Sequence, residues 1–121
     1  MIIVLPNTPS NIVAFKALGE VTKKDFEEVV MPAVDNLVKK TGKLNYLLEI
    51  DTELSNFTAG AWWQDALLGI KKLTKWNKAA IISDSEGISK FTTIFSVIMP
   101  GEFKAFKKTE LNKAIEWVSA E

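Results

Sequence analysis

Apolar and polar positions follow two different periods along the chain, and the points where the period changes mark nine expected elements. Runs that are apolar throughout, or at every second residue, predict strands at residues 2–5, 12–18, 44–50, 79–82 and 103–107. Apolar residues three and four apart predict helices at residues 22–42, 58–73, 84–98 and 109–118. The resulting order is strand, strand, helix, strand, helix, strand, helix, strand, helix, which is typical of an α/β protein.

The connections between the expected strands set their directions. Residues 6–11 form a link that suits an antiparallel hairpin and is too short for a parallel crossover. Each later pair of strands is separated by a helix, as right-handed parallel crossovers require. The sequence therefore predicts a single five-stranded, mostly parallel sheet with an antiparallel edge strand and four helices. Residues 103–107 interleave apolar and charged side chains, which indicates a half-exposed edge strand.

Local signals mark the ends of several elements. Thr22 is expected to cap the first helix, and Gly42 is expected to end it in a left-handed conformation. Pro32 lacks a backbone N–H and is expected to bend that helix. Residues 76–78 are interpreted as a turn before the strand at 79–82, and Thr109 is expected to cap the last helix.

The composition excludes several kinds of chemistry. All 15 cationic side chains are lysines, and the chain has no arginine, histidine or cysteine. Disulfides, thiolate nucleophiles, imidazole ligands and a Ser-His-Asp triad are thereby excluded, as is bidentate phosphate binding by arginine. We therefore expect no catalytic residue, no metal and no cofactor.

Length and charge narrow the class further. With 121 residues, the sequence is expected to form one domain over residues 1–121. The lysines balance 15 acidic residues, and a net charge of zero argues against nucleic-acid binding. Residues 1–6 lack the features of a signal peptide, and no apolar run approaches the ~18 residues of a membrane span. We therefore expect no membrane span and a cytoplasmic protein.

Ligands of open α/β sheets bind beyond the carboxyl ends of the strands, where residues 19–20, 51–58 and 84–87 are expected to meet. Carboxylates gathered there could hold a magnesium ion or serve an enzyme, with Asp51 or Asp84 as base or phosphoacceptor. The favoured interpretation is that these acids solvate loops and complement helix dipoles, because no ligand-loop spacing accompanies them. The four acidic residues concerned are Glu49, Asp51, Glu53 and Asp84.

Hydroxyl side chains stand near the expected helix starts. Ser55, Thr58 and Ser85 are placed where backbone N–H groups and the helix dipole favour a phosphate. Ser55 and Thr58 are therefore candidate phosphoacceptors, whose modification would order or displace the loop. Ordinary helix capping is the alternative, and for Thr58 it is the favoured one.

The helix expected at 84–98 has more apolar residues than a single buried face would require. Trp62 and Trp63 are consecutive, so they lie about 100° apart on a helix, where one can be core while the other tends toward the rim. Deep burial within the domain is one explanation. The other is a surface that pairs with another subunit or encloses an apolar ligand. The candidate residues for binding a ligand or partner are Phe57, Thr58, Trp62, Trp63, Phe91, Ile94, Phe95, Ile98 and Met99.

Several segments resemble the SpoIIAA-like proteins, which are small bacterial domains related to the STAS fold and often grouped with the CRAL-TRIO lipid-binding architecture. The resemblance covers essentially the whole chain. The matching segments are Met31-Pro32-Ala33, residues 57–62 (Phe-Thr-Ala-Gly-Ala-Trp), Pro100-Gly101-Glu102 with the strand that follows, and Ala114 with Trp117-Val118.

The resemblance implies a SpoIIAA/STAS-like fold and a non-enzymatic domain. STAS relatives act as anti-sigma-factor antagonists that are switched by phosphorylation of a serine at the start of the helix after a central strand. The positions here that most resemble this serine are Thr58 and Ser55. The sequence lacks the Asp-Ser-Ser-Gly-like stretch of true antagonists, so the role is not transferred.

Three functional hypotheses follow. The leading one is a regulatory or binding domain that works through protein contacts, either with another protein or with itself as a homodimer. The second is a carrier or sensor of a small apolar, lipid-like ligand, lined by the aromatic residues above. The third, a carboxylate-dependent enzyme, has the least support, because the strong catalytic side chains are missing.

Overall fold

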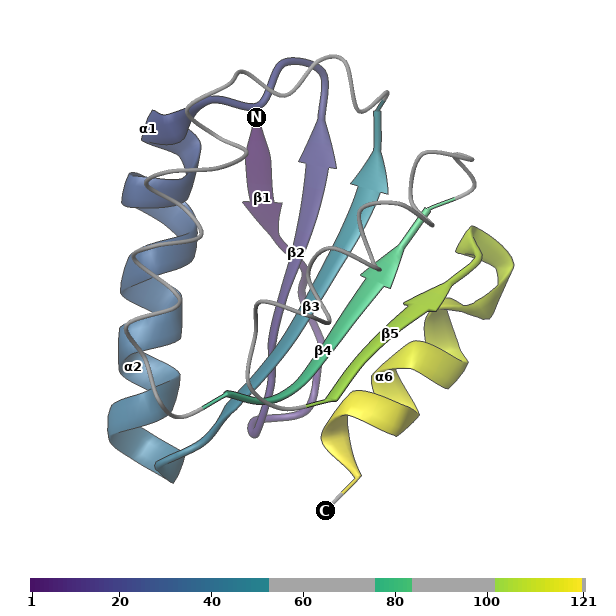
Figure 1. Ribbon diagram of the computed structural model, residues 1–121. Coiled ribbons are helices and arrows are strands. Elements are labelled where there is room, and N and C mark those ends of the chain that lie inside the picture. The colour runs from purple at the N-terminus through teal and green to yellow at the C-terminus, as the bar shows by residue number, and fades with distance from the viewer. Residues whose placement is uncertain (53–75, 84–101, 121) are drawn as a thin grey trace.

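The computed structural model describes residues 1–52, 76–83 and 102–120. Its centre is one five-stranded sheet in the order β1-β2-β3-β4-β5 (Figure 1). β1 pairs with β2 antiparallel, and every other neighbouring pair is parallel. The prediction of a mostly parallel sheet with an antiparallel edge strand is thus confirmed. The strands are β1 (Ile2–Val4), β2 (Val13–Leu18), β3 (Leu44–Asp51), β4 (Trp76–Ile82) and β5 (Glu102–Phe106).

β4 is longer than the sequence pattern indicates. Residues 76–78, interpreted as a turn, are its first three residues, so that interpretation is wrong. Trp76 pairs with Leu44, and Lys78 pairs with Asn45 after a register shift in the ladder. Two of these three residues, Asn77 and Lys78, are polar, but the backbone pairing of the segment with β3 makes it a strand.

The first helical region has three parts: α1 (Lys23–Asp25), a π-helical turn η1 (Phe26–Val30), and α2 (Met31–Thr41). The Thr22 cap is confirmed, since the Thr22 N–H donates to the Asp25 carboxylate at 2.9 Å and the Asp25 N–H donates to the Thr22 hydroxyl at 3.3 Å. The π turn lies directly before Pro32, and the Met31 N–H there donates to the Phe26 carbonyl, five residues back. A π turn is one way in which a helix accommodates a local disturbance of its hydrogen-bond ladder.

The sequence signals placed the end of α2 better than the start of α6. Gly42 ends α2 with φ +76° and donates its N–H to the Val38 carbonyl at 2.8 Å, as predicted. Thr109 does not cap the last helix, which is a correction. A 3₁₀ turn, η3 (Lys108–Glu110), contains Thr109 and leads into α6 (Leu111–Ser119), and the Lys107 N–H donates to the Glu110 carboxylate at 3.0 Å. Glu110 thus bonds the backbone N–H of Lys107, three residues before it, and α6 has no side-chain cap of its own.

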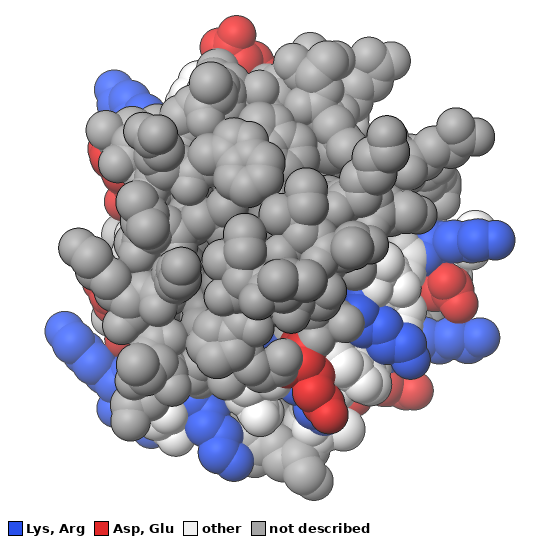
Figure 2. All heavy atoms as spheres, in the orientation of Figure 1, with Lys and Arg blue, Asp and Glu red and all other residues white. Residues whose placement is uncertain are grey.

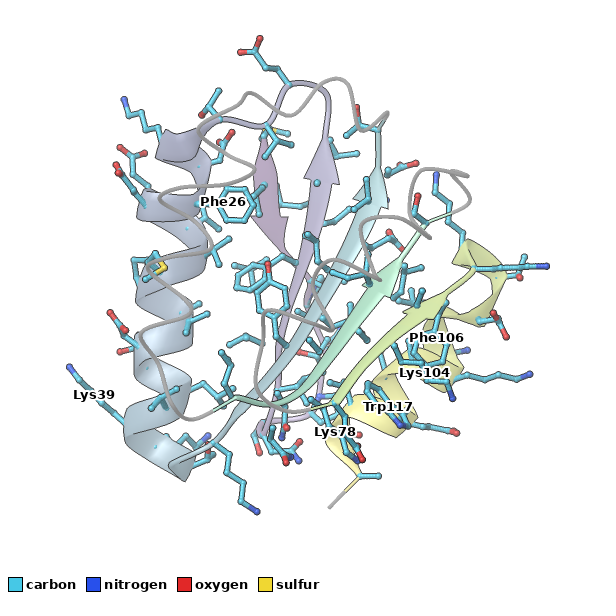
Figure 3. The ribbon with its side chains drawn as sticks, in the orientation of Figure 1. Phe26, Lys39, Lys78, Lys104, Phe106 and Trp117 are labelled. Carbon is cyan, nitrogen blue, oxygen red and sulfur yellow. The ribbon has the colours of Figure 1, made fainter. Side chains whose placement is uncertain are left out.

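Two apolar layers enclose the sheet. One contains Phe15, Tyr46 and Ile81 together with η1 and α2 residues such as Phe26, whose ring points from the helix toward the sheet (Figure 3). The other contains Leu47, Ala80 and Phe106 packed against α6. β3 is buried from Leu44 to Ile50, which confirms the expectation of a strand covered on both faces.

Two of the four predicted helices are present in the described residues, and those expected at 58–73 and 84–98 lie outside them. In the ranges that the structure describes, no helix has the length and apolar content needed to cross a membrane. Figure 2 shows lysines and acidic residues interspersed along the visible margin of the described part. The charges on this described margin thus do not segregate by sign.

Candidate functional site

The carboxyl ends of β2, β3, β4 and β5 lie along one edge of the sheet, which we call the carboxyl edge (Figure 1). The predicted meeting of segments there is confirmed in its described part, because the Thr52 hydroxyl donates to the Gly19 carbonyl at 3.0 Å. Ser83 follows β4 at this edge. It is buried, and its N–H donates to the Phe106 carbonyl at 3.0 Å. This is the position at which open α/β sheets place their ligands.

Asp51 is the centre of the charges at the carboxyl edge. The Lys108 ammonium donates to Asp51 Oδ1 at 2.5 Å, and the Lys16 ammonium lies 3.6 Å from Asp51 Oδ2. Lys16 also lies 3.6 Å from Glu49 Oε1, since Lys16 and Glu49 are paired neighbours on β2 and β3. The four side chains come from three different segments and balance to zero charge.

Lysine contacts alter the acidity of Asp51. The hydrogen bond and positive charge of Lys108, followed by the charge of Lys16, hold the pKa of Asp51 below its usual value. Asp51 is 40% exposed and Lys108 is 37% exposed, whereas the Glu49 side chain is only 12% exposed. Water therefore reaches the Asp51–Lys108 pair, which can exchange its partners, while Glu49 is held by Lys16 inside the sheet.

This arrangement bears on the magnesium and enzyme hypotheses. Glu49 and Asp51, the two described members of the acidic set, are paired with lysines, and Glu53 and Asp84 lie outside the described residues. Within the described ranges, no three acidic side chains gather as a metal site would need. Glu49 and Asp51 therefore form charge pairs with lysines at a partly exposed surface.

Sequence reasoning missed a polar network at the opposite end of the sheet. Asn45 is 1% exposed, and its Nδ2 donates to the Asn11 carbonyl at 3.0 Å while its Oδ1 accepts from Asn77 Nδ2 at 2.9 Å. Asn11 Nδ2 in turn donates to the Ser119 carbonyl at the end of α6, at 2.8 Å. A single asparagine inside the otherwise apolar start of β3 was the available signal. The network ties three loop and strand starts to α6.

A second missed feature joins lysines and aromatic rings on β4, β5 and α6 (Figure 3). The Lys78 ammonium donates to the Trp117 and Ala120 carbonyls, at 3.0 and 2.6 Å, and lies 5.4 Å from the Trp117 ring. The Lys104 ammonium lies 5.3 Å from the Phe106 ring and 5.9 Å from the Trp117 ring. Lys78 thus caps the C-terminus of α6 from a different element, as a cation at that end should.

The residues predicted to bind a ligand or a partner, and the two candidate phosphoacceptors, lie outside the described residues. The structure therefore neither supports nor opposes those assignments, and they stay predictions. They are Ser55, Phe57, Thr58, Trp62, Trp63, Phe91, Ile94, Phe95, Ile98 and Met99.

A mixed five-stranded sheet with helices packed on both faces defines an open-sheet α/β protein. Within that class the sequence identifies the family. A family model described as SpoIIAA-like matches residues 12–119, and the chain belongs to the SpoIIAA-like family. Members of this family are typically regulatory domains that interact with proteins.

One solved structure similar to this chain is an uncharacterized protein of the DUF3478 family from Shewanella loihica PV-4, which has a SpoIIAA-like fold. The two sequences are 26% identical, the alignment covers 97% of this chain and 93% of that chain, and the TM-score is 0.67. Among curated proteins, none matches this chain. The comparisons thus agree on the fold and on the family.

Proposed function

We propose that residues 1–121 form a single non-enzymatic regulatory domain that binds another protein at the carboxyl edge of its sheet. The observation that supports this most is the Asp51 cluster, in which one partly exposed carboxylate at the end of β3 holds two lysines from different segments. Regulatory protein contacts are also typical of the SpoIIAA-like family.

The physical argument concerns the cost of changing partners. An ion pair at an exposed position contributes little to stability, because water solvates both charges nearly as well as they solvate each other. A partner protein can therefore form an ion pair with Lys108 or Asp51 in place of their mutual pair, without unfolding the domain. Charged groups at such a surface also guide the approach of a partner and set its orientation. The carboxyl edge thus offers charge complementarity together with low stability of its internal pairs.

Affinity capture with the purified chain as bait tests the proposal. Wild-type protein, Asp51→Lys and the control Glu116→Lys should be compared on lysate from the cells that produce the protein. Both substitutions change the net charge by the same amount, but Glu116 is exposed on α6, away from the cluster. We expect a protein that binds wild type and Glu116→Lys and is lost from Asp51→Lys. That protein, purified, should bind in calorimetry with the same ranking.

The opposite results are equally specific. If a purified partner binds Asp51→Lys as tightly as wild type, the carboxyl edge is not its docking surface. If no protein is retained by any bait, the proposal of protein contacts fails.

A titration with fatty acids addresses the carrier hypothesis. The chain has four tryptophans, so a saturable change in tryptophan fluorescence reports an apolar ligand near them. We expect no saturable change. A saturating titration that Trp62→Phe or Phe95→Ala weakens would instead identify the candidate apolar residues as a ligand pocket and favour a lipid-like carrier.

A further inference from the structure

β5 ends the described sheet on the side opposite to β1, and no further strand of the described residues lies beyond it (Figure 1). Glu102, Lys104 and Ala105 are exposed. α6 packs through Ala114 and Val118 onto the layer that contains Leu47, Ala80 and Ile82, which come from β3 and β4. The outer side of β5 therefore has the exposure of a strand that can accept a neighbour.

The backbone direction of each β5 residue follows from one hydrogen bond. The Phe106 carbonyl accepts from the Ser83 N–H, so Phe106 points its backbone groups toward β4. Backbone groups of successive residues in a strand point to opposite edges, so Lys104 and Glu102 also point toward β4. Phe103 and Ala105 therefore direct their N–H and C=O groups away from β4.

The side chains of β5 carry a charge pattern that is complementary to itself. Glu102 and Lys104 are two residues apart, so both lie on the same face of the sheet with opposite charge. If two β5 strands run antiparallel with Phe103 opposite its own copy, Glu102 of each copy lies opposite Lys104 of the other. In that register Glu102 and Lys104 form non-hydrogen-bonded pairs, in which opposed side chains come closest.

We propose that two copies of this chain associate through antiparallel pairing of β5, with the two-fold axis at Phe103, into one continuous ten-stranded sheet. The hydrogen-bonded pair at the axis uses the outward backbone groups of Phe103. Sliding the copies by two residues places Lys104 opposite Lys104, which two like charges oppose. Charge and backbone direction thus select the same register.

This inference is independent of the proposed function, because β5 pairs along the side of the sheet and the Asp51 cluster lies at its carboxyl edge. Loss of the dimer leaves binding at Asp51 intact, and loss of binding at Asp51→Lys leaves the dimer intact. The two proposals therefore fail separately.

Charge exchange tests the pairing. In sedimentation equilibrium, Glu102→Lys and Lys104→Glu each place like charges opposite one another at two symmetric positions, and each should weaken dimerisation at least tenfold, or about 1.4 kcal/mol. The double variant with both substitutions restores opposite charges and should dimerise as wild type does. An equimolar mixture of the two single variants should form the heterodimer. Lys113→Glu and Glu116→Lys, on exposed positions of α6, are the controls for net charge and should leave dimerisation unchanged.

A cross-linking experiment checks the register independently. The chain has no cysteine, so a single introduced thiol forms only intermolecular disulfides. Phe103→Cys places two thiols across the axis, with Cα atoms about 5.5 Å apart, which a disulfide spans. Ala105→Cys places them about 13 Å apart along the strands, which it cannot span. We expect covalent dimer from Phe103→Cys and none from Ala105→Cys.

The contrary outcomes overturn the proposal. A monomer mass for wild type at every concentration would mean that Lys104 protects the edge from pairing, as edge lysines do in many sheets. A dimer that resists both charge reversals, or that cross-links more readily through Ala105→Cys, would place the interface elsewhere or in another register.

Discussion

Replacing Asn45 by alanine should destabilise the protein more than any other single amide substitution in the described residues. The Asn45 side chain is 1% exposed, and it provides both a donor to the Asn11 carbonyl and an acceptor for Asn77 Nδ2. Alanine removes both hydrogen bonds at once. Leu44 and Leu47, apolar neighbours on β3, cannot replace them because they have no side-chain polar atoms.

The size of this destabilisation follows from the polar groups that lose their hydrogen-bond partners. A buried polar group without a partner costs about 1–3 kcal/mol. Asn77 is half-buried, so water can partly solvate its amide, whereas the Asn11 carbonyl faces the buried Asn45 position. We therefore expect a loss of about 2–4 kcal/mol in the free energy of unfolding, a large part of the ~5–15 kcal/mol typical of a domain.

Urea unfolding followed by circular dichroism measures this loss as a lower midpoint at an unchanged slope. The matched control is Asn36→Ala, the same substitution at an exposed position of α2, which should be neutral or stabilising by a few tenths of a kcal/mol. In a double-mutant cycle, Asn77→Ala should cost less in the Asn45→Ala background than in wild type. A loss below about 0.5 kcal/mol for Asn45→Ala would refute the reasoning, since no buried group can then have lost its partner.

Three further predictions follow from local geometry. Gly42→Ala should lower the free energy of unfolding in urea by about 1–2 kcal/mol. The reason is backbone strain alone, because φ at Gly42 is +76° and a Cβ there meets no atom within 4 Å. Gly42→Asn should cost less, and a Gly42→Ala variant as stable as wild type would contradict the left-handed cap. Tyr46 is the only tyrosine, and burial raises its pKa, so stability should fall above about pH 10 and phenolate absorbance should appear only when the protein unfolds. Tyr46→Phe is the control for absorbance from other groups. Reversible ionisation of Tyr46 in the folded protein near pH 10 would contradict its burial. Because the pKa of Asp51 is depressed, its contribution to stability is present above about pH 4 and is lost as pH falls through its folded pKa. Asp51→Asn should therefore flatten the acidic part of the plot of unfolding free energy against pH. An unchanged acidic part would show that the lysines do not stabilise the Asp51 carboxylate in solution.

The hydrogen bonds that sequence predicted correctly at helix ends join residues close along the chain. Thr22 and Asp25 are three residues apart, and the Gly42 N–H reaches back four residues to Val38. The strand pattern at 44–50 was equally readable, because burial on both faces requires apolar residues throughout. In these cases the physical cause and the residues that show it occupy one short segment.

The features that sequence missed join residues far apart. Asn45 and Asn77 are 32 residues apart, and Lys78 reaches the Trp117 carbonyl 39 residues away. Nothing near any of these residues in the chain indicates the partner. The parallel register of β3 and β4 brings Asn77 to Asn45, and the packing of α6 on the sheet brings the Trp117 carbonyl to Lys78. The correction at Thr109 has a different cause. Thr109 lies inside a 3₁₀ turn that precedes α6, and a hydroxyl suited to an N-cap does not by itself predict that turn.

The two ends of the sheet differ in the kind of polar contact that holds them. At the end where the parallel strands begin, Asn45 is buried, and the Lys78 ammonium bonds two carbonyls of α6, so removing one group leaves others without partners. At the carboxyl edge, Asp51 and Lys108 are both more than one-third exposed, and water can replace either of them. A surface that binds and releases a partner must change its contacts without loss of the fold. Of the two ends of the sheet, the carboxyl edge meets this condition, which is the physical reason for proposing a recognition surface at Asp51.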